Sequence, residues 1–117
     1  MTNFEKTQNR QKNSADIIAK IKTARDQARI KANAYRNLTA MEYKYWRATA
    51  ELNAYNQVLA MFEKGTEQQI PGMAATAIAE FERARDDDTN KWILALAEGR
   101  KDALASVTDW MNNKENN

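Results

Sequence analysis

Between Ser14 and Lys64 the chain contains neither glycine nor proline, the two residues that most often interrupt a helix. Apolar residues recur there mostly at steps of three, four or seven, which is the spacing along one side of an α-helix. Ser14 is a suitable N-cap, and Lys64 followed by Gly65 is a typical helix end. The whole stretch is therefore predicted to be helical.

Two apolar stripes run along this stretch. The first extends over its whole length and contains Ile17, Ile21, Ala24, Ala28, Tyr35, Tyr43, Trp46, Ala50, Ala54 and Met61. The second alternates steps of three and four, as in a coiled-coil seam, and contains Leu38, Met41, Tyr45, Ala48, Leu52, Tyr55, Leu59 and Phe62. On an ideal helical wheel the stripes lie roughly 160° apart. The second half of the stretch is thus apolar on two opposite faces, and the first half on one.

A break at residues 37–39 is the alternative to one long helix. Thr39 and Glu42 have capping-box spacing, and Asn37 can end a helix just before them. Against a break, the first stripe crosses this point in phase, and no glycine is present to make the turn. We therefore favour a single rod of roughly 75 Å, with a helical hairpin as the alternative.

Two shorter helices are predicted in the second half of the chain. Residues 65–72 form the one clear loop, and Pro71 suits the first turn of the helix expected at 73–85. Asn90 is a candidate cap for a last helix at about 90–111, which carries several large apolar side chains.

The domain organisation follows from these elements. Gly99 weakens the last helix by about 1 kcal/mol relative to alanine but does not break it. With only two valines and no alternating β-branched runs, the chain has little from which to build a sheet. We predict an all-α, bundle-like domain over 14–112, in which the long N-terminal helix or hairpin packs with two shorter helices. A flexible basic arm at 1–13 and a loose polar tail at 113–117 flank it.

The 117 residues include no cysteine and no histidine. The chain therefore lacks thiol nucleophiles, thiolate ligands, and the commonest general acid–base and transition-metal ligand. The acidic run at 86–88 has neither the ligand spacing nor the glycine of an EF-hand, and the dipole of the following helix explains it. We expect a protein that is not an enzyme and has no cofactor, metal site or small-molecule substrate.

No segment of the chain has the sequence character of a membrane span or signal peptide. The longest apolar run, at 92–97, is far too short to cross a bilayer, and residues 1–13 lack an apolar core. We expect a soluble, cytoplasmic protein without membrane association.

The apolar stripe of residues 14–36 has no obvious segment to cover it. An isolated amphipathic helix is marginal in water, so a second copy of the chain, another protein or a fold-back at Asn37 must bury this stripe. We favour self-association, most simply as a dimer. A fold-back would instead give a four-helix body with the doubly apolar helix at its centre.

The densest aromatic stretch of the chain lies around Trp46. Tyrosine, tryptophan and arginine are enriched at binding hot spots, although aromatic residues at helical spacing also form cores. Together with the uncovered stripe, this stretch predicts a partner-binding surface made of Ile17, Ile21, Tyr35, Tyr43, Trp46 and Arg47.

Charge is distributed unevenly over the chain. Residues 1–40 contain nine basic and three acidic residues (net +6), and the remainder contains nine basic and 13 acidic residues (net −4), which together give the overall +2. Four bases form a ridge at helical spacing beside the apolar stripe: Lys22, Arg25, Arg29 and Arg36. Such a ridge can meet an acidic protein surface or a phosphate backbone, or can simply be solvated.

These observations favour a non-enzymatic helical binding protein, such as an adaptor, regulator or inhibitor, that occupies the surface of a macromolecular partner and self-associates. One alternative is a nucleic-acid-associated protein that uses the basic ridge, although no helix-turn-helix or RNA-binding aromatic motif supports it. The other is a structural coiled-coil assembly subunit.

Overall fold

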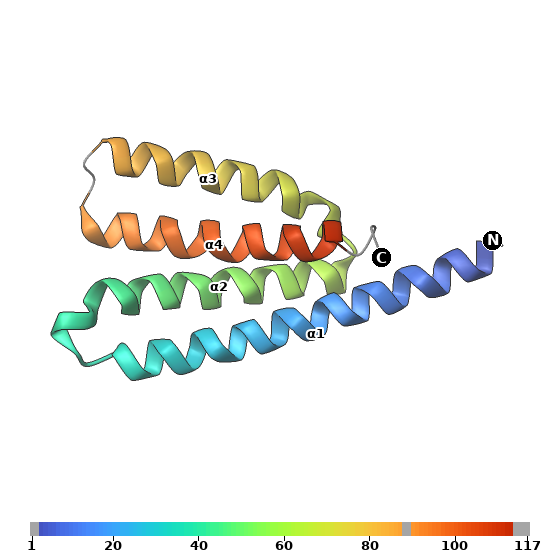
Figure 1. The fold of residues 1–117 in the computed structure, drawn as a ribbon, viewed down its shortest axis with the longest axis horizontal. Helices are drawn as coiled ribbons and strands as arrows, with labels where there is room; N and C mark the ends of the chain where they lie inside the picture. Colours follow the sequence, from blue (N-terminus) through green and yellow to red (C-terminus); the bar gives the residue numbers. More distant parts are fainter. Residues whose placement is uncertain (1–2, 88–89, 114–117) are drawn as a thin grey trace.

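The protein is an all-α bundle, as predicted. The computed structural model describes the backbone of residues 3–87 and 90–113, and the side chains of these ranges from residue 14 onward. Within these described ranges four helices follow one another: α1 (Asn3–Tyr35), α2 (Glu42–Lys64), α3 (Ile70–Asp86) and α4 (Lys91–Asn113). In space their order is α1, α2, α4, α3, because α2 packs between α1 and α4, and α3 packs on α4 (Figure 1). The molecule measures 56 × 29 × 24 Å.

The chain turns back between Tyr35 and Glu42, so the favoured single rod is wrong and the alternative hairpin is confirmed. The reversal is made by two hydrogen-bonded turns: the Leu38 amide donates to the Tyr35 carbonyl (3.1 Å), and the Met41 amide donates to the Leu38 carbonyl (2.9 Å). Leu38 itself is extended (φ −105°), so glycine is not needed there. A 3-10 turn at Thr39–Met41 then leads into α2 without a side-chain cap.

The position of α2 explains its two opposite apolar faces. A helix between two neighbours must bury a face against each, and α2 contacts both α1 and α4. All four helices contribute to one core, whose largest fully buried side chains are Ile21, Val58, Ile70, Leu104 and Val107. This core lies toward the end of the bundle at which α2 connects to α3 (Figure 1).

Two predicted helix ends are confirmed by their hydrogen bonds. Gly65 adopts a left-handed φ of 75°, and the amides of Gly65 and Thr66 donate to the carbonyls of Phe62 and Met61, a Schellman ending. The Asn90 side-chain oxygen accepts hydrogen bonds from the amides of Trp92 and Ile93 in the first turn of α4. The loop predicted at 65–72 is shorter than expected, since a 3-10 turn at Glu67–Gln69 leads into α3 three residues early.

The first helix continues into the segment predicted to be an arm. The backbone is helical from Asn3, and in Figure 1 this part of α1 extends past the ends of the other helices. The flexibility expected of residues 1–13 stays a prediction. Of the predicted tail, residues 114–117 lie outside the described residues.

Helices α2 and α4 approach each other very closely at Gly99. A Cβ atom at this position would overlap the Arg47 carbonyl oxygen and would lie only 2.9 Å from the Ala50 Cβ. Buried alanines surround the crossing, namely Ala48 and Ala50 on α2 and Ala95 on α4. The absence of a side chain at Gly99 therefore sets the distance between the two central helices.

Within the described ranges, no helix combines the length and apolar character that crossing a bilayer requires. The same part of the chain contains no group of three or more acidic side chains arranged to hold a metal ion.

Candidate functional site

Trp46 is the centre of an aromatic cluster at the end of the bundle where α1 turns into α2. Its ring meets the Tyr45 ring edge-to-face, with centroids 5.1 Å apart and planes inclined by 71°. It meets the Trp92 ring of α4 in the same way, at 5.9 Å and 72°. Trp92 follows the Asn90 cap, so the first turn of α4 carries it to this end of the molecule.

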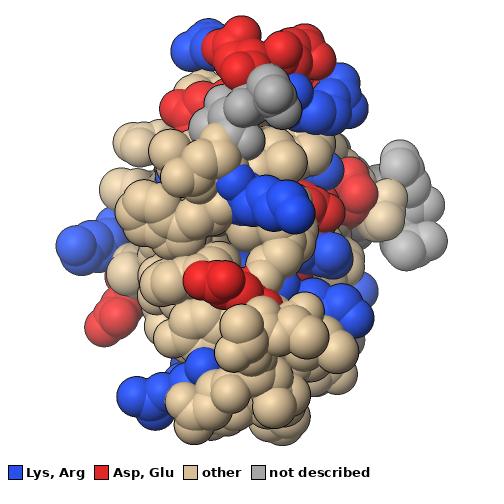
Figure 2. All heavy atoms as spheres, turned by 90° about the vertical axis from the view of Figure 1, so that its left-hand side faces the viewer, with Lys and Arg blue, Asp and Glu red and all other residues tan. Residues whose placement is uncertain are grey.

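Large apolar side chains at the rim of this cluster are unusually exposed, while Tyr45 and Trp46 themselves are half-buried. The exposed fractions are 52% for Leu38, 48% for Trp92 and 45% for the neighbouring Ile93. We define the aromatic end surface as Tyr35, Leu38, Glu42, Tyr45, Trp46 and Trp92. Figure 2 views this end directly and shows that uncharged atoms cover most of its middle and lower part, with charged side chains scattered between them.

Two hollows flank Trp46 on the aromatic end surface. The hollow toward α1 is lined by Tyr35, Leu38 and Tyr45, among others. The hollow toward α4 is lined by Tyr43, Asn90 and Trp92, among others. Thr39, Glu42 and Trp46 line both, so the two hollows share one wall.

The close α2–α4 crossing lies next to the cluster. At Gly99 the α2 backbone and the Ala50 Cβ leave no room for a further side chain. Trp46 stands one turn before Ala50 and Trp92 two turns before Gly99, so the two rings meet beyond the crossing, toward the helix starts.

Tyr43 and Arg47 take part in a polar network between α2 and α4. The Arg47 guanidinium lies 3.5 Å from the Glu51 carboxylate, 3.4 Å from that of Glu98 and 3.8 Å from that of Asp102. The Tyr43 hydroxyl donates a hydrogen bond to the second oxygen of Glu98. Arg47, predicted to bind a partner, is therefore already engaged by three carboxylates of its own chain.

Burial and the Glu98 carboxylate raise the pKa of Tyr43 from 10.0 to about 12, against the opposite effect of Arg47. We expect stability to fall between about pH 10 and pH 12, because folded Tyr43 keeps its proton where the unfolded chain has lost it. Tyr43→Phe removes this contribution, on the order of 1 kcal/mol after solvent screening. Urea midpoints of wild type and variant should therefore converge as the pH rises. A constant difference over this range would contradict the prediction.

Ile17 and Ile21, predicted to bind a partner, lie in the core. Their exposed fractions are 6% and 0%, because the fold-back of the chain buries the stripe of α1 within the bundle. They are therefore not part of a partner surface in this structure, and they lie far along α1 from the aromatic end surface. Of the predicted partner-binding residues, only Tyr35, Tyr43 and Trp46 line its hollows.

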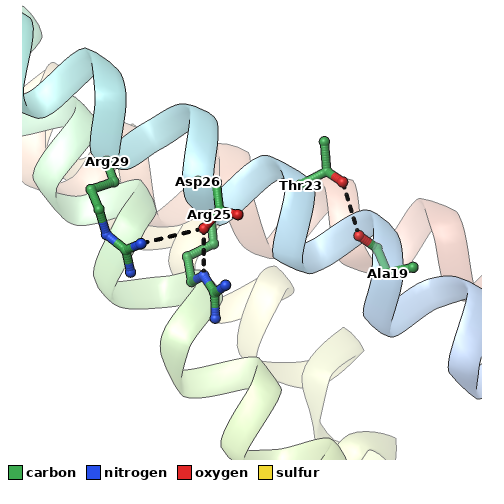
Figure 3. A network of polar contacts seen from close by, with 5 residues as sticks. All are labelled: Ala19, Thr23, Arg25, Asp26 and Arg29. Carbon is green, nitrogen blue, oxygen red and sulfur yellow. Dashed lines mark hydrogen bonds and ion pairs between the residues drawn. The ribbon is translucent and has the colours of Figure 1, made fainter.

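The predicted basic ridge lies along α1 and is partly neutralised. One oxygen of Asp26 lies 3.1 Å from the Arg25 guanidinium and 3.4 Å from that of Arg29 (Figure 3). Lys22 and Arg36 are exposed, and Arg36 lines the hollow toward α1. The ridge and the aromatic end surface are thus largely separate features of the molecule.

Sequence reasoning missed Trp92 and Leu38 as surface residues. It treated position 92 only as the start of the longest apolar run, at 92–97, and assigned Leu38 to a coiled-coil seam. Their positions in the chain were the available signal: Trp92 stands two residues after Asn90, and Leu38 directly follows Asn37. A helix begins or ends at these points, and large apolar side chains there can reach solvent.

No protein-family model matches the chain, and neither a curated protein nor a solved structure is significantly similar to it.

Proposed function

We propose that the chain is a non-enzymatic binding protein that occupies the surface of a protein partner with its aromatic end surface. The observation that supports this most is the joint exposure of Trp92 and Leu38 on either side of Trp46. Exposed apolar side chains gathered at one place mark interaction sites more often than the same side chains scattered singly. Tryptophan and tyrosine are also the residues that contribute most to binding energy in protein interfaces.

The packing beneath this surface supports the same proposal. The edge-to-face contacts of Trp46 with Tyr45 and Trp92 hold the rings in place before a partner arrives. Rings that are already ordered lose little conformational freedom on binding, which favours affinity. The two hollows give partner side chains somewhere to insert.

The structure gives less support to two other expectations, self-association and nucleic-acid binding. Self-association was expected because the stripe of residues 14–36 had no cover, but α1 packs against α2 and that stripe is now largely buried. The nucleic-acid alternative depended on four bases at helical spacing, and Asp26 pairs with two of them. The aromatic end surface depends on neither argument.

Capture of a partner should depend on the aromatic end surface and not on exposed apolar residues elsewhere. We expect Trp92→Ala and Leu38→Ala each to reduce recovery of a partner from lysate of the source cells at least tenfold, as for hot-spot residues. Ile30→Ala is the matched control, because Ile30 is 67% exposed but lies on α1 outside this surface. Circular dichroism should show unchanged helicity in all three variants. Equal recovery by wild type and both surface variants would contradict the proposal.

A further inference from the structure

The hollow between the end of α1 and the start of α2 has an unusual lining. Three of the residues that line this open hollow of about 280 Å³ are aromatic, namely Tyr35, Tyr45 and Trp46. This volume is at the lower limit of pockets for drug-sized ligands, so it suits a group the size of a side chain. The planes of Tyr45 and Trp46 are inclined by 71°, so their rings form two adjoining walls and not one flat surface.

The rings of this hollow favour a cation, and its lining holds one carboxylate, Glu42, and one guanidinium, Arg36. The faces of aromatic rings carry negative potential and attract ammonium and guanidinium groups, especially when several rings surround the charge. Glu42 lines the same hollow, is exposed, and forms no ion pair with any side chain that the structure describes. One carboxylate and three rings are the chemical composition of an aromatic cage for organic cations.

Tyr35 already interacts with a cation of its own chain. The Lys44 ammonium lies 5.9 Å from the Tyr35 ring centre, in a second hollow that is shared with Lys31 and Arg47. Lys44 does not line the hollow of Tyr45 and Trp46, so it leaves that hollow open. Arg36 is the one base in its lining and repels any cation bound there, so the attraction must come from the rings and Glu42.

We propose that the hollow of Tyr35, Tyr45 and Trp46 binds an organic cation, namely a lysine or arginine side chain of the protein partner, with Glu42 as the opposite charge. The source of the cation rests on the proposed function, whereas the cation site itself does not. The hollow therefore gives the partner surface a specific chemistry: a basic side chain that inserts beside Trp46.

The full chain can be tested without the partner. Choline and its uncharged isostere 3,3-dimethyl-1-butanol are titrated at constant ionic strength, and the Trp46 indole N–H is followed by NMR. We expect a saturable shift with choline and roughly tenfold weaker binding of the isostere, because only choline gains the interaction with the rings and with Glu42. Equal binding of both compounds, or no saturable shift with choline, would overturn the proposal.

Variants of the charged residues test how Glu42 and Arg36 affect the affinity for choline. Glu42→Gln keeps the shape of the side chain and should weaken choline binding several-fold, and Arg36→Gln should strengthen it. Glu63→Gln, at the far end of α2 and also exposed, is the matched control and should leave affinity unchanged. An unchanged affinity in Glu42→Gln would overturn the role of Glu42.

The source of the cation is tested with blocked amino acids. Nα-acetyl-lysine methylamide and its arginine counterpart should shift the Trp46 indole, and the norleucine counterpart should not. Binding of choline but of neither basic derivative would overturn the assignment to a partner side chain. Failure of all cations together with retained, Trp92-dependent capture of a partner would remove the cation site and leave the proposed function in place.

Discussion

Replacing Gly99 with alanine is expected to lower the free energy of unfolding by about 2–3 kcal/mol, as overpacking of a tight interface does. Alanine favours a helix over glycine by about 1 kcal/mol, so the steric cost must exceed this gain. It should, because the new methyl group would overlap the backbone carbonyl of Arg47 and crowd the Ala50 Cβ. A carbonyl cannot rotate away as a side chain can, so α2 and α4 would have to separate. Urea unfolding followed by circular dichroism measures the loss.

Gly72 is the matched control for this substitution. It also lies in a helix, α3, but a Cβ atom there would meet nothing within 4 Å. Gly72→Ala should therefore raise the free energy of unfolding by about 0.5–1 kcal/mol, the sign expected from helix propensity and the entropy of the unfolded chain. The two glycines should respond with opposite signs. If Gly99→Ala were also stabilising, the close α2–α4 approach would be wrong.

Gly99 illustrates what the sequence can and cannot predict. Its effect on helix propensity is local and follows from residue type alone. Its role at the α2–α4 crossing depends on Arg47 and Ala50, some fifty residues earlier in the chain, and no pattern near Gly99 indicates that contact. Secondary structure and fold class were therefore predictable, whereas the reason for a glycine within α4 was not.

The hairpin between α1 and α2 shows a similar limit. Two opposite apolar faces on residues 38–62 indicated a helix with neighbours on both sides, which is what α2 is. The apolar spacing of the first stripe continues across Asn37 without a shift, which argued for one rod. The number of residues in the turn leaves that spacing unchanged, so the spacing alone could not reveal the turn. Since Leu38 reverses the chain in an extended conformation, no glycine signalled the turn.

Part of the candidate site followed from residue types. Tyr35, Tyr43 and Trp46 were singled out as a dense aromatic stretch, and all three line the hollows at the bundle end. Trp92 was not connected with them, because the contact between the two tryptophans spans 46 positions and requires the packing of α4 on α2. Arg47 was predicted to face a partner, but two of its three ion pairs, to Glu98 and Asp102, come from α4 and could be known only from the fold.

Replacing Ile21 with alanine is expected to lower the free energy of unfolding by about 2–5 kcal/mol, the range for deleting a buried aliphatic side chain. Ile21 has an exposed fraction of 0% and packs in the core formed by all four helices. The truncation loses burial energy and leaves a cavity in the core that the surrounding side chains close only in part. The total free energy of unfolding of a domain is only about 5–15 kcal/mol, so this substitution should remove a large share of it. Thermal and urea unfolding measure the change.

Ile30→Ala provides a control of the same residue type on the same helix. Ile30 is 67% exposed, so its truncation should change stability by no more than about 0.5 kcal/mol. The pair also separates the two roles considered for the α1 stripe. A core role predicts a large loss for Ile21→Ala in the isolated protein. A partner-binding role predicts normal stability and weaker capture, and that result would mean that α1 does not pack against α2 as the fold requires.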